Sequence, residues 1–187
     1  IFGKWIKSEH WWPDYVYRLF KKGHVTWEDT IHGVPFTRGK GEDLPIKEEL
    51  AILHHHYETV SQYVDRLNRY TNHQVQHQVE AGYSFAWSDV VVKPLEEFLN
   101  QYFARRGYSE GLHGLALALL QAFSECVLYL KMWQHSGFVP VQLSVDQLQQ
   151  EVNTHRGKIK WWGYQVKINS SSWPVSWWWK LLRKLRI

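Results

Sequence analysis

Hydrophobic residues recur at helical spacing through the middle of the chain. Over residues 58–81 the apolar side chains lie three or four positions apart, which predicts an amphipathic helix that Gly82 ends. A second helix is expected to start at Pro94, because proline suits a first helical position, and to end at Gly107. Residues 109–134 form the longest apolar stretch. Polar and charged residues interrupt it, so we expect a buried or interface-lying helix and not a membrane span.

The first 54 residues have the pattern of short strands joined by loops. Residues 15–20 alternate in the way a strand does, and residues 24–27 form a second β-type stretch. Residues 46–53 predict either a third strand or an irregular approach to the first helix. Glycine and proline punctuate this region at Gly23, Gly33, Pro35, Gly39, Gly41 and Pro45.

The C-terminal part combines three patterns. Ser144, with Gln147 three residues later, has the form of a capping box and predicts the start of a short helix. Residues 158–161 and 164–168 alternate like strands, and residues 169–172 are typical of a linker. Residues 176–187 predict an amphipathic helix with apolar residues on one side and cations on the other. The apolar side carries Trp177, Trp178, Leu181, Leu182 and Leu185.

Charge is divided unevenly along the chain. The net charge is +4, but all 18 acidic residues lie at or before Glu151, where 14 basic residues leave −4. The remaining 8 basic residues follow Glu151 without an acid and give +8. A basic end on an acidic body predicts an anionic partner, which is either lipid headgroups or nucleic acid. The chain has no helix-turn-helix, RNA-recognition or zinc-finger signature, so we expect a membrane surface and no nucleic acid.

Two residue counts narrow the chemistry. The single cysteine, Cys126, excludes an internal disulfide, fits a reducing compartment and is expected to be a small core residue. The 12 tryptophans are many for this length. Tryptophan has a large apolar body and an N–H group, which suits cores, sugar-binding surfaces and membrane interfaces.

Short motifs follow one another in a fixed order over residues 2–135. They are Gly3-Lys4-Trp5-Ile6, Trp12-Pro13-Asp14, Arg18-Leu19-Phe20, Trp27, Ile31-His32, His54, Asn68-Arg69-Tyr70-Thr71, Lys93-Pro94-Leu95, Phe98-Leu99, Tyr102, Arg106-Gly107, Glu110-Gly111 and Gly114-Leu115. In this order and spacing the chain resembles the C-terminal half of bacterial family 2 glycosyltransferases that act on lipopolysaccharide core or other cell-envelope acceptors.

The resemblance implies an α/β GT-A fold whose C-terminal part is mostly helical. In that family a Rossmann-like N-terminal half binds the nucleotide-sugar, and an Asp-x-Asp motif holds a divalent metal, Mg or Mn. This sequence has no Asp-x-Asp, and its only methionine is Met132. We therefore expect a C-terminal piece of a longer enzyme that is inactive by itself, with the donor and metal ligands outside this chain. Within it we expect acceptor-side strands and loops at 1–57, a helical region at 58–152 and a basic Trp-rich tail at 153–187.

An inverting sugar transfer needs a carboxylate that takes the proton of the acceptor hydroxyl. Family members often carry His-Glu where this chain has His32 and Gly33, so the base is not carried over directly. Asp29 is the favoured candidate, followed by Glu28 and Asp14, against the alternative that all three are solvated loop acids.

Binding roles are expected for several neighbours of these acids. His32 is interpreted as orienting the acceptor, or else as making a structural hydrogen bond. Arg18 is expected to contact a donor phosphate, or to pair with Asp14 and hold the loop. The aromatic residues Trp11, Trp12 and Trp27, with Trp5 and Tyr15, are candidates for stacking on sugar rings, with core packing as the alternative.

Two further groups invite a binding role. In the run His54-His55-His56 alternate residues of a strand could share a metal, but no supporting ligand is spaced for it, so we expect no metal site in this chain. The tail is expected to dock on an anionic membrane, because tryptophan prefers the interface and cations the headgroups, with packing against another part of the protein as the alternative. The residues expected to contact the membrane are Trp177, Trp178, Trp179, Lys180, Arg183, Lys184 and Arg186.

The resemblance therefore implies part of a glycosyltransferase, and with the basic tail it places the enzyme on the cytoplasmic face of the cell membrane. Its partners would be a nucleotide-sugar donor, a glycan or lipid-linked acceptor and the membrane surface. The main alternative is a non-catalytic module that binds glycan or membrane.

Overall fold

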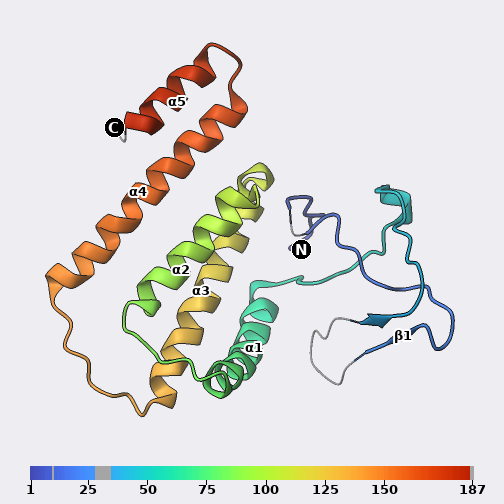
Figure 1. The fold of residues 1–187 in the computed structure, drawn as a ribbon, viewed down its shortest axis with the longest axis horizontal. Helices are drawn as coiled ribbons and strands as arrows, with labels where there is room; N and C mark the ends of the chain where they lie inside the picture. Colours follow the sequence, from blue (N-terminus) through green and yellow to red (C-terminus); the bar gives the residue numbers. More distant parts are fainter. Residues whose placement is uncertain (10, 28–34, 186–187) are drawn as a thin grey trace.

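The computed structural model describes residues 1–9, 11–27 and 35–185, and these form a helical body with a long, extended N-terminal segment (Figure 1). The strands are β1 (Val25–Thr26) and β2 (Phe36–Thr37), and the α-helices are α1 (Val60–Glu80), α2 (Asp89–Leu99), α3 (Leu112–His135), α4 (Val145–Ser170) and α5 (Val175–Leu185). Short helical turns are η1 (Glu48–Leu50), the π-helix η2 (Asn100–Ala104) and η3 (Gly107–Glu110). The mostly helical character is confirmed.

The N-terminal segment has less regular structure than its alternation predicts. The strand expected at residues 24–27 is confirmed at Val25–Thr26, where Val25 is opposite Thr37 in an antiparallel pair. The strand expected at residues 15–20 is wrong, because these residues find no pairing strand in the described part of the chain. Residues 46–53 take the irregular alternative, with only the turn η1.

Helix α1 confirms the expected helix and its stop. The side chain of Thr59 accepts a hydrogen bond from the Gln62 N–H at 3.1 Å, and the Gln62 side chain accepts one from the Thr59 N–H. This reciprocal cap fixes the first turn. Gly82 follows with φ of +75°, a left-handed conformation that glycine adopts without strain.

Helix α2 begins earlier than predicted. The expectation that Pro94 is its first residue is wrong, because the helix starts at Asp89 and contains Pro94. The Asp89 carboxylate accepts a hydrogen bond from the Ala86 N–H at 2.8 Å, which holds the chain at the start of the helix. The helical path then passes through η2, ahead of the expected end near Gly107.

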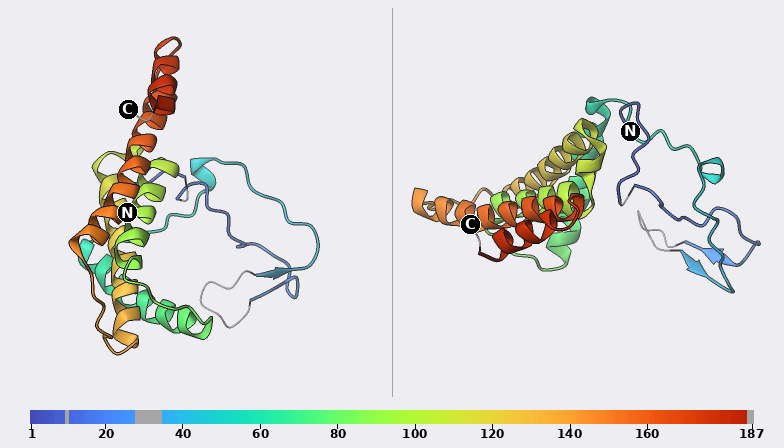
Figure 2. Two further views of the ribbon diagram at one scale, coloured as in Figure 1. Left: turned by 60° about the vertical axis from the view of Figure 1, so that its left-hand side comes forward. Right: turned by 90° about the horizontal axis from the view of Figure 1, so that it is seen from above.

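Helices α1 and α3 enclose two clusters of buried residues. The first contains Ile6, Tyr57, Tyr63, Leu67 and Leu117, so it also anchors the N-terminal segment. The second contains Val75, Leu128, Tyr129 and Met132. Together with α2, these helices form the packed centre of the molecule (Figure 1, Figure 2).

Helix α3 has a mixed character. By length and composition it could cross a membrane. In the structure it packs against α1 and α2, and 28% of its most apolar 18-residue stretch is buried. The helix is therefore confirmed, and its relation to a membrane stays a prediction. Cys126 is half-buried in it, and burial raises the pKa of its thiol, which suits a packing residue.

Helix α4 is the largest departure from the sequence expectations. The capping box at Ser144 is confirmed, with the Gln147 N–H donating to the Ser144 hydroxyl at 3.1 Å, but the helix is long and continues to Ser170. The strands expected at 158–161 and 164–168 are therefore wrong. Contacts at helical spacing decide the outcome: His155 is buried, Lys158 pairs with Glu96 at 2.8 Å, and Trp162 stacks on Phe103.

The C-terminal amphipathic helix is confirmed as α5, which folds back along α4 as a helical hairpin (Figure 2). Only Ser171 and Ser172 of the expected 169–172 linker lie outside α4, and with Trp173 and Pro174 they connect the two helices. Helix α4 runs continuously through residue 152, where a domain boundary was expected.

One prediction concerns the contact between α1 and α3. The Lys131 ammonium lies 2.8 Å from the Asn68 carbonyl and Thr71 Oγ1 and 2.6 Å from Asn72 Oδ1, and desolvation lowers the pKa of its amine. Lys131→Met keeps the apolar stem but leaves these oxygens without their donor, so we expect a loss of about 1–2 kcal/mol in the free energy of unfolding. Urea denaturation measures it. Lys22→Met on the exposed N-terminal segment is the control and should stay within about 0.5 kcal/mol of wild type.

Candidate functional site

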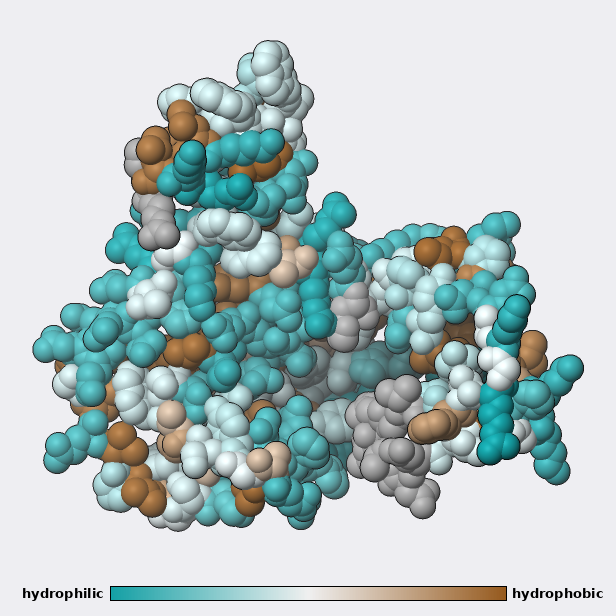
Figure 3. Space-filling view, viewed as in Figure 1, coloured by the Kyte–Doolittle hydropathy of each residue, from teal (hydrophilic) through white to brown (hydrophobic). Residues whose placement is uncertain are grey.

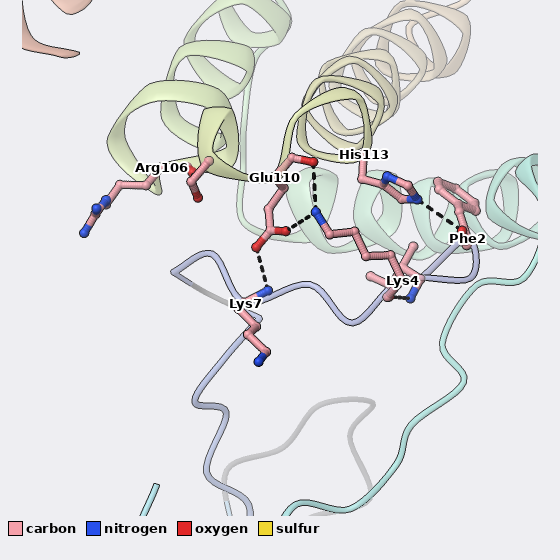
Figure 4. Close-up of polar contacts among 8 residues, drawn as sticks. Phe2, Lys4, Lys7, Arg106, Glu110 and His113 are labelled. Atoms are coloured by element: carbon pink, nitrogen blue, oxygen red, sulfur yellow. Dashed lines mark hydrogen bonds and ion pairs between the residues drawn. The ribbon is translucent and has the colours of Figure 1, made fainter. Parts of the chain in front are cut away.

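The N-terminal segment is fixed to the helical body by a polar cluster around Glu110, here called the Glu110 junction (Figure 4). The Lys4 ammonium lies 2.8 Å from Glu110 Oε2 and donates to the Glu110 carbonyl at 3.1 Å. The Lys7 backbone N–H donates to Glu110 Oε1 at 2.7 Å. Beside it, His113 Nε2 lies 3.2 Å from the Phe2 carbonyl. Residues more than a hundred positions apart are thereby held together.

The Glu110 carboxylate is buried but charged. Burial alone would raise its pKa, but the hydrogen bond from Lys4 and those from the backbone N–H groups of Lys7 and Ser8 outweigh burial and lower the pKa. A carboxylate held in this way acts as a fixed anchor for its donors.

Glycines bring the parts of this junction close together. The Gly107 carbonyl oxygen lies 1.8 Å from where a Cβ on Gly114 would stand, so only glycine lets η3 meet the first turn of α3. Arg106 has φ of 58°, an unusual left-handed conformation for a non-glycine residue. The Arg106 side chain points away from Glu110 (Figure 4). Arg106 is one of the residues that line a neighbouring hollow.

This hollow is a cavity of about 510 Å³ between the N-terminal segment, η2, η3 and α4. Its lining combines rings with amide and charged groups: Glu9, Phe103, Ala104, Arg106, Tyr108, Trp162, Gln165, Val166 and Asn169. The rings of Phe103 and Trp162 are stacked with centroids 6.3 Å apart. Rings offer flat apolar faces, and the amides and guanidinium offer hydrogen bonds, so the lining matches a small polar ligand with an apolar face.

The predicted sugar-stacking residues divide between packing and exposure. Trp11 lies against the first core cluster and 6.0 Å from the His56 ring, and Trp12 packs edge-on to Trp5 at 5.1 Å. Trp27 lies 5.1 Å from Phe20 and remains 52% exposed. Of Trp11, Trp12 and Trp27, only Trp27 is therefore exposed to solvent over about half of its surface.

Of the three candidate bases, only Asp14 lies within the described residues. Glu28, Asp29 and His32 lie outside the described residues. Asp14 and Arg18 are both exposed on the N-terminal segment, and within the described ranges no ion pair joins them. The loop-holding Asp14–Arg18 pair is therefore not found.

The histidine run lies just before α1. His54 Nε2 and His56 Nδ1 are 3.4 Å apart, and burial lowers the pKa of His56 to about 4, with His54 and Arg66 adding to the effect. His56 is therefore neutral at pH 7. Among the residues that the structure describes, no group of three or more His, Cys, Asp or Glu is arranged to hold a metal ion. The described residues therefore offer no set of ligands that fits the divalent metal implied by the resemblance.

The basic tail is split by the hairpin. Trp177 and Trp178 are 60% and 53% exposed, and Lys180 and Lys184 also face solvent. Trp179 lies 6.1 Å from Tyr164 of α4, and the Arg183 guanidinium lies 5.2 Å from the Trp161 ring. Arg186 is outside the described residues. The tail therefore has one face packed against α4 and one face exposed to solvent.

The Glu110 junction and the cavity were not predicted as sites. Lys4, Arg106 and Glu110 belong to the motifs that carry the resemblance, but the sequence gives no sign that Lys4 and Glu110 pair. Trp162, Gln165 and Asn169 were missed because two strands, at residues 158–161 and 164–168, and a linker at residues 169–172 were expected where α4 runs. Reading α4 as a helix would have placed these three residues on one face.

Comparison of the chain with models of known protein families, with curated proteins and with solved structures finds no match.

Proposed function

We propose that this chain supplies the acceptor side and C-terminal helices of an inverting glycosyltransferase of the GT-A type. The enzyme would move a sugar from a nucleotide-sugar to a cell-envelope acceptor, lipopolysaccharide or lipid-linked, on the cytoplasmic face of the membrane. The donor and metal would be held outside this chain, which would not transfer sugar by itself.

The Glu110 junction carries the proposal. The motifs Gly3-Lys4-Trp5-Ile6 and Glu110-Gly111, on which the resemblance to family 2 enzymes depends, meet through Lys4 and Glu110. Arg106-Gly107 and Gly114-Leu115 meet beside them through the close approach of Gly107 and Gly114. Four motifs of the resemblance thus form one structural unit.

The surroundings of this unit suit a sugar acceptor. The cavity beside Arg106 offers aromatic faces together with amide and carboxylate hydrogen-bonding groups, the combination that recognises a pyranose ring. A base that deprotonates the acceptor hydroxyl would come from the N-terminal segment, with Asp29 favoured over Glu28 and Asp14.

A sugar-transfer assay on the protein encoded by the whole reading frame tests the proposal. The donors are a panel of radiolabelled nucleotide-sugars with Mg or Mn, and the acceptor is a membrane extract. We expect transfer by wild type and a fall of about a hundredfold or more for Asp29→Asn, because the amide cannot accept the proton. Asp43→Asn, another acid of the same segment, is the control and should keep the wild-type rate.

Two results would contradict the proposal. Absence of transfer with every donor, combined with retained glycan binding, would favour the non-catalytic module. Transfer by residues 1–187 alone would overturn the assignment of the donor site to another part of the enzyme. An unchanged rate for Asp29→Asn would remove Asp29 as the base and leave Glu28 and Asp14 to be substituted in the same assay.

A further inference from the structure

The α4–α5 hairpin ends in an exposed surface that combines aromatic and basic side chains. Helix α5 has no buried residue among those described. The connection and the open face of α5 expose Trp173 by 82%, Trp177 by 60% and Trp178 by 53%, with Leu185 at 56%. Figure 3 shows apolar and strongly hydrophilic side chains intermixed over this end of the molecule.

The opposite face of α5 is held on α4 by specific contacts. The Lys167 ammonium lies 4.2 Å from the Trp179 ring, and Arg183 lies over the Trp161 ring and hydrogen-bonds Gln165. Trp179 and Arg183 therefore orient the helix. This fixed orientation leaves Trp177, Trp178, Lys180 and Lys184 together on the outside.

Charge identifies the partner. After Glu151 the chain has eight cations and no acid, and among the described ones only Lys158 makes an ion pair, with Glu96. Cations beside exposed tryptophans match the headgroup region of an anionic bilayer, where indole rings settle and Lys and Arg meet lipid phosphates. Nucleic acid would also be attracted by this positive charge, but binding to nucleic acid does not explain why Leu185 is exposed on the same face.

We propose that the α4–α5 hairpin docks on an anionic lipid surface through Trp173, Trp177, Trp178, Lys180 and Lys184, while Trp179 and Arg183 hold the docking face in position. The surface stands on its own observations, so it holds or fails separately from glycosyltransferase activity.

Vesicle flotation tests the proposal with the full chain. The probe is vesicles of phosphatidylethanolamine with about a third phosphatidylglycerol, and vesicles of pure phosphatidylcholine are the neutral comparison. We expect wild type to float with the anionic vesicles, to bind the neutral ones weakly and to lose binding as salt rises. Trp177→Ser/Trp178→Ser should lower the partition coefficient about tenfold or more. Trp27→Ser, with an indole of similar exposure on the N-terminal segment, should bind as wild type.

A charge exchange keeps the test decisive if the tryptophan variant misfolds. Lys180→Glu/Lys184→Glu should abolish binding to anionic vesicles, whereas Lys21→Glu/Lys22→Glu has the same net charge and should retain most of it. Circular dichroism verifies the helical content of each variant. Wild type that stays off the anionic vesicles, variants of the hairpin that bind like wild type, or preferential binding to duplex DNA at the same salt would each overturn the proposal.

Discussion

Gly114→Ala is expected to destabilise the helical body by about 3 kcal/mol, the upper end of the usual cost of overpacking. A Cβ at this position would stand 1.8 Å from the Gly107 carbonyl oxygen and 3.1 Å from the Glu110 Cβ. Both obstacles lie in the η3 turn, and the nearer one is backbone, so no side-chain rotation relieves the overlap. The first turn of α3 must move away from η3. Unfolding in urea, followed by circular dichroism, measures the loss.

Two glycines of α4 provide matched controls with the opposite sign. A Cβ at Gly157 or Gly163 meets nothing within 4 Å, and both residues lie inside the helix. Gly157→Ala and Gly163→Ala should each stabilise the protein by about 0.5–1 kcal/mol, because alanine loses less backbone entropy in a helix. If Gly114→Ala behaved like these two, the close approach of η3 and α3 would not exist in solution.

The Gly114 substitution also bears on the N-terminal segment. Glu110 is the last residue of η3, so moving η3 from α3 shifts the carboxylate that holds Lys4 and the Lys7 N–H. Protease cleavage within residues 11–53 should therefore become faster in Gly114→Ala. The same cleavage should stay slow in Gly163→Ala, which leaves the junction intact.

The sequence predicts helices well where local signals and periodicity agree. Thr59 and Gly82 bound α1 close to the expected limits, and the amphipathic pattern of the tail gives α5. Where a segment fits both a helix and a strand pattern, the spacing of its hydrophobic residues alone does not predict which of the two forms. Residues 158–168 alternate like strands, but contacts of His155, Lys158 and Trp162 with α2 and η2 stabilise a helix. Such contacts depend on segments distant in sequence, so no local pattern contains them.

The candidate site shows the same limit. The aromatic character of the N-terminal segment is visible in the sequence, but which tryptophan is packed and which is exposed is not. Trp11 packs against the first core cluster beside His56, whereas Trp27 stays exposed. Likewise, three consecutive tryptophans of the tail were expected to act alike, and the hairpin separates Trp179 from the other two.

Lys4→Met is expected to lower the free energy of unfolding by about 2–3 kcal/mol at pH 7. It leaves the Glu110 carboxylate, whose side chain is 7% exposed, with its backbone donors but without its cation. Leaving a fully buried charge without its partner costs several kcal/mol of stability. The Lys4 side chain is 38% exposed, so we expect a smaller cost here than for a fully buried ion pair. Lys7→Met is the matched control: its side chain pairs with the exposed Glu48, so its loss should cost less than about 1 kcal/mol.

The pH dependence separates this ion pair from simple packing. The pKa of Glu110 is lowered in the folded protein below its ordinary value of 4.5, so the stabilisation it gives is present above pH 4.5 and is lost as the pH falls through the folded-state pKa. The stability difference between wild type and Lys4→Met should therefore narrow over that acid range, because a protonated Glu110 no longer needs the cation. In the Glu110→Gln background, Lys4→Met should cost much less than in wild type at pH 7. A difference that stayed constant with pH, or an equal cost in both backgrounds, would show that Lys4 acts through the packing of its stem and that Glu110 does not hold the N-terminal segment by charge.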